Sequence, residues 1–416
     1  MTRIEADLLI PGQGAPIQDG VVILEGGRIS YAGPAATAPP APGGQPASER
    51  AAAVMPGLWD CHGHLTGTRS MNLERTPMEP PELRAARCAR DLRAALDAGV
   101  TSVREVGGLG IFLTRAVSEG TLEGPAIYAA GSILSTTGGH GDLHAYPLHW
   151  IEDFAASTSM LRLCDGVPEC VRAVREQLRR GASLIKVCAS GGVLSELDDP
   201  VHQQFTLAEL RAIVEIAGLA ERPVAAHCHG KPGIIAALQA GVRTIEHGTY
   251  LDDECCDAMR ETGAILVPTR TIIEELLGSE SGMPDYARVK LEAIAGTHAE
   301  AVAHAYSSGV KIAMGTDISS TGTELPNSWG RNGRELGHLV KCGLSPLDAI
   351  EAGTATGPLT LGAQGPRSGQ LAAGYDADVL TLSASPLSDI SVLSDQSKIV
   401  GVWRAGRQVK GAPSPA

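Results

Sequence analysis

The sequence predicts an α/β protein in which a (β/α)₈ TIM barrel is joined to a small β-sandwich domain built from both ends of the chain. Three observations lead to this fold class. The chain has 416 residues, more than one ordinary domain needs. Its middle part repeats a helical stretch, a glycine and a short aliphatic strand, whereas both ends carry only short strands and turns. We therefore expect a composite β domain from residues 1–55 and 370–416, and a barrel from residues 56–369.

Short strands and glycine turns mark both ends of the chain. Val21–Leu24 and Arg28–Tyr31 flank the turn Glu25-Gly-Gly27, which is typical of a β-hairpin. Near the other end, Asp378–Leu382 and Ile399–Trp403 have a similar apolar character. Neither end is long enough to form a substantial sandwich alone, so we expect the two ends to combine.

The middle of the chain repeats one pattern. A helical stretch ends at a glycine, the residue that most easily takes the left-handed conformation at a helix C-terminus, and an aliphatic strand follows. These joints lie at Gly99, Gly181, Gly241, Gly263 and Gly309. Further strands are expected at Leu58–Asp60, Ala126–Ala130 and Pro223–Ala226. Eight strands that alternate with helices over this length fit a (β/α)₈ barrel better than an open sheet.

Composition and motifs exclude several classes of function. The formal net charge is −13 and the chain has no basic run, which argues against binding to nucleic acids or anionic membranes. No phosphate-binding glycine motif follows a strand, so nucleotide-binding folds are disfavoured. The nine cysteines are odd in number and include no C-x-x-C pair. Together with the lack of a signal-like start or a membrane-length apolar run, this predicts a cytoplasmic protein that acts on a small molecule.

Polar residues follow the predicted barrel strands at the ends where barrel enzymes carry their chemistry. Six of them would converge on one mouth: His62, His64, Lys186, His227, His247 and Asp317. Two histidines separated by one residue on a strand point to the same face, here the barrel interior. A packed interior has little reason to hold such a pair unless the pair binds something. Imidazoles and a carboxylate suit a divalent metal, zinc first, with manganese, iron and cobalt as alternatives.

Lys186 lies in the apolar strand Ser183-Leu-Ile-Lys-Val187, where a charged ammonium group is costly. Three interpretations are open: a lysine that reaches a carboxylate partner, a Schiff-base lysine, and a neutral amine that has captured CO₂ as a carbamate. The carbamate is an anionic oxygen bridge that can hold two metals. With four histidines and an aspartate nearby, it explains this lysine best.

These motifs resemble the amidohydrolase superfamily in its binuclear-metal subtype with a carboxylated lysine. The resemblance covers nearly the whole chain and is carried by these motifs: Met55-Pro-Gly-Leu-Trp-Asp-Cys-His-Gly-His64, Ile185-Lys186, Ala226-His227, Ile245-Glu-His247-Gly, Met314-Gly-Thr-Asp317 and the tail Gly374-Tyr-Asp-Ala-Asp-Val-Leu380. It implies that His62, His64 and Asp317 hold the more buried metal. It also implies that His227 and His247 hold the second metal, and that a carboxylated Lys186 and a hydroxide bridge the two. Asp317 would then act as general base and general acid.

Within the superfamily, the sequence resembles the branch that hydrolyses dipeptides and N-acyl amino acids, which includes prolidase-like enzymes and amidases acting on ochratoxin-like compounds. The segments that carry this resemblance are Ser135–Asp142, Ala225–Gly230 and Glu246–Tyr250. The resemblance implies that His140 donates a hydrogen bond to the substrate carbonyl and that Tyr250 contacts the substrate carboxylate. Both His227 and His229 can face inward. The family pattern favours His227 as the ligand and leaves His229 as a substrate contact.

Specificity is expected in three long loops, at residues 65–81, 136–163 and 318–336. Tyr146, Trp150 and Trp329 could line an apolar pocket there, and Arg331 or Arg334 could bind a carboxylate. Related enzymes often assemble, so a homo-oligomer is also expected.

Two other functions compete with the amide hydrolase. The first is an imidazolonepropionase-like cyclic amide hydrolase or a deaminase, although Lys186 argues against the deaminase. The second is a non-catalytic scaffold, which is disfavoured because all six ligand residues are present.

Overall fold

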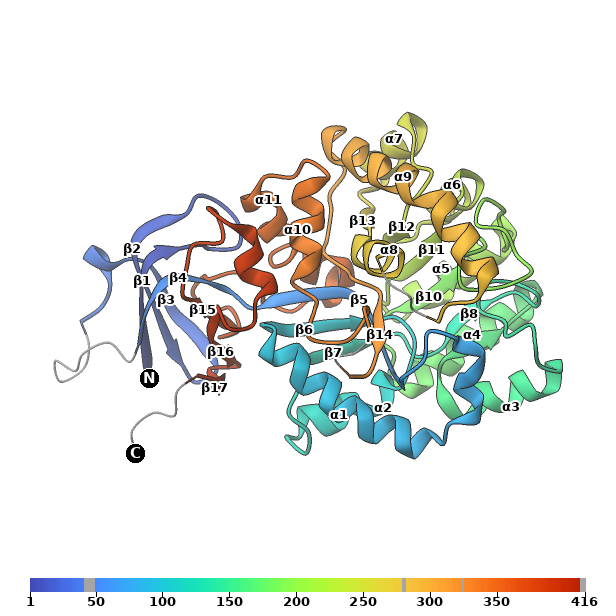
Figure 1. The fold of residues 1–416 in the computed structure, drawn as a ribbon, viewed down its shortest axis with the longest axis horizontal. Helices are drawn as coiled ribbons and strands as arrows, with labels where there is room; N and C mark the ends of the chain where they lie inside the picture. The colour runs from blue at the N-terminus through green and yellow to red at the C-terminus, as the bar shows by residue number, and fades with distance from the viewer. Residues whose placement is uncertain (41–48, 279–281, 323–324, 412–416) are drawn as a thin grey trace.

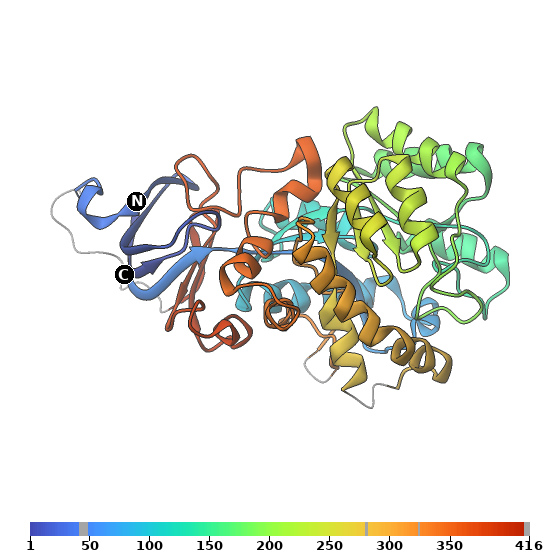
Figure 2. The same cartoon turned by 90° about the horizontal axis from the view of Figure 1, so that it is seen from above.

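The computed structural model describes residues 1–40, 49–278, 282–322 and 325–411. It has two parts, shown in Figure 1 and from above in Figure 2. One is a seven-stranded sheet from both ends of the chain, called the terminal sheet below. The other is a larger region in which helices surround parallel strands. The chain is therefore an α/β protein.

The terminal sheet has the strand order β17-β16-β15-β4-β1-β2-β3. Its strands are β1 (Thr2–Leu9), β2 (Ile17–Glu25), β3 (Arg28–Pro34), β4 (Glu49–Pro56), β15 (Val379–Leu382), β16 (Ile399–Arg404) and β17 (Arg407–Lys410). The predicted hairpin is confirmed, because β2 and β3 pair antiparallel around Gly26 and Gly27, whose φ angles are 56° and 82°. The two ends of the chain meet where β15 pairs antiparallel with β4. They thus share one hydrogen-bonded sheet.

The larger region contains two parallel sheets. A four-stranded sheet has the order β14-β5-β6-β7, and a six-stranded sheet has the order β13-β12-β11-β10-β8-β9. Their strands are β5 (Leu58–Thr68), β6 (Val100–Glu105), β7 (Ala126–Ala129), β8 (Ile133–Ser135), β9 (Leu161–Leu163), β10 (Ile185–Cys188), β11 (Val224–Cys228), β12 (Thr244–His247), β13 (Ile265–Val267) and β14 (Ile318–Ser320). Parallel pairing brings the carboxyl ends of neighbouring strands to one edge.

Helices alternate with these strands and lie around them in Figure 1. They are α1 (Pro81–Asp97), α2 (Gly110–Ser118), α3 (Leu148–Thr158), α4 (Gly166–Arg180), α5 (Leu207–Gly218), α6 (Lys231–Ala240), α7 (Asp253–Thr262), α8 (Arg270–Leu277), α9 (Asp285–Ser307), α10 (Arg334–Lys341) and α11 (Pro346–Ala352). Short 3₁₀ segments are η1 (Ala35–Thr37), η3 (Leu73–Met78), η4 (Gly357–Gln364) and η5 (Ile390–Ser394). The glycine joints are confirmed by positive φ angles, for example 90° at Gly181 and 95° at Gly241.

Seven of the eight predicted strands of this region are present, as β5, β6, β7, β10, β11, β12 and β13. The eighth, expected after Gly309, forms only an isolated parallel bridge between Ile312 and Leu266. The first strand was expected to end at the His62-Gly-His64 motif. In the structure β5 continues to Thr68, and β14 pairs with it at Gly63 and Thr68. The short strands β8, β9 and β14 were not predicted.

The core is aliphatic, as a sequence with 3% aromatic residues requires. Valine, isoleucine, leucine and alanine side chains fill the space between the parallel strands and the helices. All nine cysteines are buried and unpaired. Within the ranges given above, no helix has the length and apolar character needed to cross a lipid bilayer.

Candidate metal centre

The six residues predicted as metal ligands lie on or beside the parallel strands of the two sheets. His62 and His64 are on β5, Lys186 is on β10, His227 is on β11, His247 ends β12, and Asp317 immediately precedes β14. All six line one cavity of about 170 Å³. The structure therefore brings the complete predicted set together.

One group of potential ligands joins His62, His64 and Asp317. The Oδ1 atom of Asp317 lies 3.1 Å from Nε2 of His64 and 3.7 Å from Nε2 of His62. Burial acts to raise the pKa of Asp317, but the neighbouring His62 and His64 outweigh it, so that the pKa is lowered. Asp317 is therefore a carboxylate, the form that binds metals.

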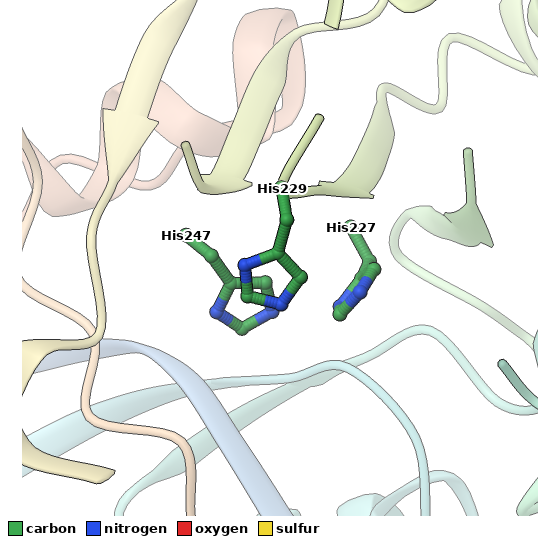
Figure 3. A group of neighbouring side chains, drawn as sticks. All are labelled: His227, His229 and His247. Carbon is green, nitrogen blue, oxygen red and sulfur yellow. The ribbon is translucent and has the colours of Figure 1, made fainter. Parts of the chain in front are cut away.

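A second group joins three histidines, His227, His229 and His247, whose rings face one another in Figure 3. The ring centroids are 4.5 Å apart for His227 and His247, and 4.9 Å apart for His229 and His247. Burial lowers the pKa of all three rings well below the ordinary value, and the neighbouring histidines lower it further. Neutral imidazoles with a free ring nitrogen are metal ligands. The prediction separated His229 from this group, whereas the structure places it within the group.

The two groups are neighbours, because the rings of His62 and His247 are 5.0 Å apart. Lys186 lies close to both groups: its charge acts to lower the pKa of all five histidines, although Asp317 and the carbonyl of Gly107 outweigh it at His64, whose pKa is raised. The Nζ atom of Lys186 is buried and has no hydrogen-bond partner, and burial lowers the pKa of its amine. A buried amine without a partner is costly as a cation. These surroundings favour the uncharged form of the amine.

Four of the clustered histidines have one ring nitrogen engaged by the protein, and His64 has both, because its Nε2 also lies 3.1 Å from Asp317. Nδ1 of His62 lies 2.6 Å from Glu246, and Nδ1 of His64 lies 2.7 Å from the carbonyl oxygen of Gly107. In the second group, the contacts are His247 Nδ1 to Thr269 Oγ1 at 2.7 Å, His229 Nδ1 to Thr249 Oγ1 at 2.7 Å, and His227 Nε2 to Gly191 O at 3.1 Å. Such outer contacts orient a ring and leave its other nitrogen for a metal. This pattern suits the two groups of potential ligands.

A buried ion pair supports His62 from behind. The Glu246 carboxylate is fully buried and accepts hydrogen bonds from Nη2 of Arg104 at 2.7 Å to each oxygen. Burial acts to raise the pKa of Glu246, but Arg104 and His62 hold it below its ordinary value. Since burial also lowers the pKa of His62 to about 4, a neutral His62 donates from Nδ1 to this carboxylate. Arg104 was not predicted, because the short strand that carries it gives no signal of a buried partner.

The backbone at the edge of the site has unusual conformations. His247, Thr269 and Asp317 have φ angles of 69°, 56° and 60°, although none of them is a glycine. Non-glycine residues in this left-handed region cost about 1–3 kcal/mol each and cluster at functional sites. Two of these residues are potential ligands, and the third contacts one.

His140 lines the same cavity, next to His227 of the second group. Its ring stacks on that of His227 with a centroid distance of 4.2 Å, and its Nδ1 lies 2.7 Å from the hydroxyl oxygen of Ser195. The amide N–H of His140 donates to Gln204. Burial lowers the pKa of the imidazole, so His140 is neutral. Its position fits a hydrogen-bond donor to a bound substrate, as expected.

Several predicted substrate contacts lie elsewhere. Trp150 is 55% exposed, Trp329 is buried beneath Gly63, and Tyr146 donates to the carbonyl oxygen of Glu74, so the expected aromatic pocket is wrong. Arg331 and Arg334 both contact Glu275 and do not line the cavity. Tyr250 is half-buried, packs against the cluster around Ile272 and Leu291, and is not among the residues lining the cavity. Its contact with a substrate remains a prediction.

The cavity wall comes partly from the predicted loops and partly from elements that were not predicted. The first two loops supply Leu73, Glu74, residues 140–144, Met160 and Leu161, but the third loop supplies only Ser319 among the described residues. The rest of the wall comes from the segment after β10 (residues 193–196) and from α8 and α9. These helices gave no sequence signal beyond an ordinary amphipathic pattern.

The chain resembles known hydrolases over nearly its whole length. A model of the amidohydrolase family matches residues 53–409. The chain is 39% identical to ochratoxinase from Aspergillus niger, over 99% of this chain and 87% of that protein. The crystal structure of A. niger ochratoxinase superposes with a TM-score of 0.90 and covers 99% of this chain and 96% of that one. A Xaa-Pro dipeptidase with methionine bound in its active site is 29% identical, with a TM-score of 0.85 and coverage of 99% and 100%.

Proposed function

Since the chain belongs to the amidohydrolase family and is a hydrolase of amide carbon–nitrogen bonds, we propose that it cleaves a dipeptide or an N-acyl amino acid with two metal ions. The observation that carries the proposal is the meeting of both ligand groups and Lys186 in one cavity. The names of two similar proteins, an ochratoxinase and a Xaa-Pro dipeptidase, support this substrate class.

The proposed ligands of each metal ion come from the two groups of side chains described above. His62, His64 and Asp317 would hold one divalent ion, and His227 and His247 would hold the other. A carbamate on Lys186 would bridge them, and the buried Nζ without a partner fits this modification. Imidazole and carboxylate donors suit zinc first. When bound, two such ions activate a water molecule and polarise the scissile carbonyl group.

Side chains of the chain would perform the remaining steps. Asp317 takes a proton from the attacking water and delivers it to the leaving amine, which is general base and general acid catalysis. Its lowered pKa keeps the group ionised, as a proton acceptor must be. His140 donates from Nε2 to the substrate carbonyl oxygen while the Ser195 hydroxyl donates to its Nδ1. A fixed donor of this kind stabilises the charge that develops on that oxygen. His229 contacts the substrate beside the metals.

The proposal is tested by metal analysis together with a hydrolysis screen of dipeptides and N-acyl amino acids. We expect two metal ions per chain, amide cleavage, and a loss of at least about 10³-fold in kcat for Asp317→Asn. Asp19→Asn, an exposed carboxylate on β2, is the control and should keep full activity. Full amide hydrolysis by metal-free protein would refute the proposal. Ammonia release from an aminated heterocycle without amide cleavage would favour the deaminase alternative.

The choice between His227 and His229 has its own test. His227→Ala should reduce the metal content from two ions to one, whereas His229→Ala should keep two ions and raise KM. The reverse result would exchange the two roles without changing the reaction.

We also propose the wider organisation expected from the sequence. The two parallel sheets would be parts of one (β/α)₈ barrel over residues 56–369, with residues 1–55 and 370–416 as a sandwich-like second domain. The nine unpaired thiols suit a reducing compartment such as the cytoplasm. A homo-oligomer is the proposed assembly, and light scattering would test it.

A further inference from the structure

The cavity extends beyond the metal centre into a chamber with an aliphatic wall. Val193 and Leu194 form one part of this wall; α8 supplies Ile272, Ile273 and Leu276, and α9 supplies Leu291 and Ile294. These side chains belong to one packed cluster together with Met71, Met283 and Ala287. The wall is therefore fixed by packing on its outer side. It offers no hydrogen-bonding side chain to the part of a substrate that lies against it.

The mouth of the same chamber is acidic. Glu74 and Asp142 are half-buried, Glu196 is exposed, and all three line the cavity. None of the three has a partner among the ion pairs of the described residues. Among the lining residues that the structure describes, Lys186 is the only lysine or arginine, and it is buried at the metal centre.

Two basic side chains near the mouth are already engaged. His144 accepts a hydrogen bond at Nδ1 from the amide of Leu197 at 3.2 Å, and its Nε2 lies 3.2 Å from the carbonyl oxygen of Gly139. These two contacts engage both ring nitrogens, so the ring bridges the two loops of the mouth. Lys290 donates to the carbonyl oxygens of Gly192, Ser195 and Asp198 on the loop after β10. Neither side chain neutralises the three carboxylates.

We propose that the site selects substrates whose group remote from the scissile amide is apolar and carries no negative charge. The proposal rests on the proposed amide hydrolysis and names the substrate class within it. A carboxylate next to the scissile bond would lie beside the histidines, whereas a carboxylate at the remote end would face Glu74, Asp142 and Glu196. The negative charges of the substrate and of these three carboxylates repel one another, and the repulsion weakens as salt is added.

The experiment uses two series of amides that differ only in remote charge. In the first, leucine carries an N-hexanoyl, N-(5-carboxypentanoyl) or N-(6-aminohexanoyl) group; in the second, N-acetyl is joined to leucine, glutamate or lysine. Both series are needed because either side of the amide can face the chamber. The metal-loaded full chain should show a kcat/KM for the anionic member at least about tenfold below that of the neutral member in one series. The difference in kcat/KM between the neutral and the anionic member should become smaller when the salt concentration is raised from about 20 mM to about 500 mM, because salt screens charges near the protein surface.

Substitution identifies the source of the selection. The double variant Glu74→Gln with Glu196→Gln removes two carboxylates, while Asp142 stays because its Oδ2 accepts from the amide of Gly138. Each removed charge should raise kcat/KM for the anionic substrate roughly two- to fivefold and should change kcat/KM for the neutral substrate much less. Glu25→Gln, an exposed carboxylate at the end of β2, is the matched control for net charge and should change nothing.

A binding measurement separates the two levels of the proposal. Ketomethylene analogues, in which CH₂ replaces the amide NH, are titrated by calorimetry and report selection without hydrolysis. Charge-selective binding of the analogues without cleavage of any amide would refute the proposed function and support the selection. Two results would overturn the proposed selection and leave the proposed hydrolysis intact. One is equal cleavage or equal binding of the anionic and neutral members, and the other is selection that persists in the double variant.

Discussion

Replacement of Arg104 by methionine should destabilise the protein strongly, because it leaves a charge buried without its partner. The side chain of Arg104 donates to the carbonyl oxygen of Cys61 at 2.5 Å, to the hydroxyl of Thr244 at 2.9 Å, and to both oxygens of Glu246 at 2.7 Å. Both Arg104 and Glu246 are almost inaccessible to solvent. Removal of one partner of a buried pair costs about 3–5 kcal/mol. That is a large part of the usual 5–15 kcal/mol of folding stability.

A double-mutant cycle measures whether the pair is the cause. Glu246→Gln alone should also cost several kcal/mol, because it leaves the Arg104 guanidinium buried without its anion. The double variant leaves neither charge, so its loss should be at least about 2 kcal/mol smaller than the sum of the single losses. Urea unfolding followed by circular dichroism gives the three values, at one fixed metal concentration because bound metal stabilises the folded state.

The control for this cycle is Arg115→Met, whose side chain is 90% exposed and forms an i,i+4 pair with Glu119. An exposed pair of this kind contributes about 0.3–0.5 kcal/mol. A loss below about 1 kcal/mol for Arg104→Met, or losses of Arg104→Met and Glu246→Gln that add without coupling, would refute the reasoning.

Three further substitutions test other parts of the molecule. Thr269→Val removes the hydroxyl beside Nδ1 of His247, so metal affinity measured by equilibrium dialysis should fall roughly 10–100-fold. Gly192→Ala would place a Cβ atom 2.2 Å from Nδ1 of His140, so the ring must move and kcat should fall about 10²-fold. Burial raises the pKa of Asp91 to about 7, against the hydrogen bond that it accepts. Since the unfolded carboxyl group ionises near pH 3.8, the protein should lose stability relative to Asp91→Asn as the pH rises from 4 to 7, by up to about 1.4 kcal/mol per pH unit in urea unfolding.

Each of these three has a result that would contradict it. Unchanged metal affinity in Thr269→Val would show that the hydroxyl does not orient the ring. Gly296→Ala on α9, where an added Cβ meets nothing within 4 Å, is the control for Gly192→Ala, and equal kcat values for the two would contradict the expected clash. A stability difference between Asp91→Asn and the original protein that does not vary with pH would refute the raised pKa.

The sequence alone allowed the ligand-bearing strand ends to be predicted, because the helix–glycine–strand pattern is local. Gly181 and Gly241 precede strands that are confirmed as β10 and β12; His247 ends β12 as predicted, whereas Lys186 is the second residue of β10, which continues to Cys188. The place of His229 was not predictable in this way. Alternation turns both His227 and His229 inward, and only the three-dimensional packing of β11 against β12 sets their distances to His247.

Contacts between distant parts of the chain explain what else was missed. The Arg104–Glu246 pair joins β6 to β12, and no spacing in the sequence reveals such a partner. The chamber wall needs α8 and α9 to pack over the strand ends, and a helix's amphipathic pattern does not say which surface it covers. The prediction of the eighth strand was wrong because only Ile312 of that segment pairs with Leu266, and one bridge does not form a strand.

The joint between β4 and β5 has a consequence for how the chain is made. Gly57 alone separates these strands, so the backbone passes directly from the terminal sheet to the strand that carries His62 and His64. On its other edge β4 needs β15, which begins only at Val379. During synthesis, the pair His62 and His64 is therefore made early, whereas β15, the strand that pairs with β4, is made almost last. The terminal sheet can therefore be completed only after nearly the whole chain has been made.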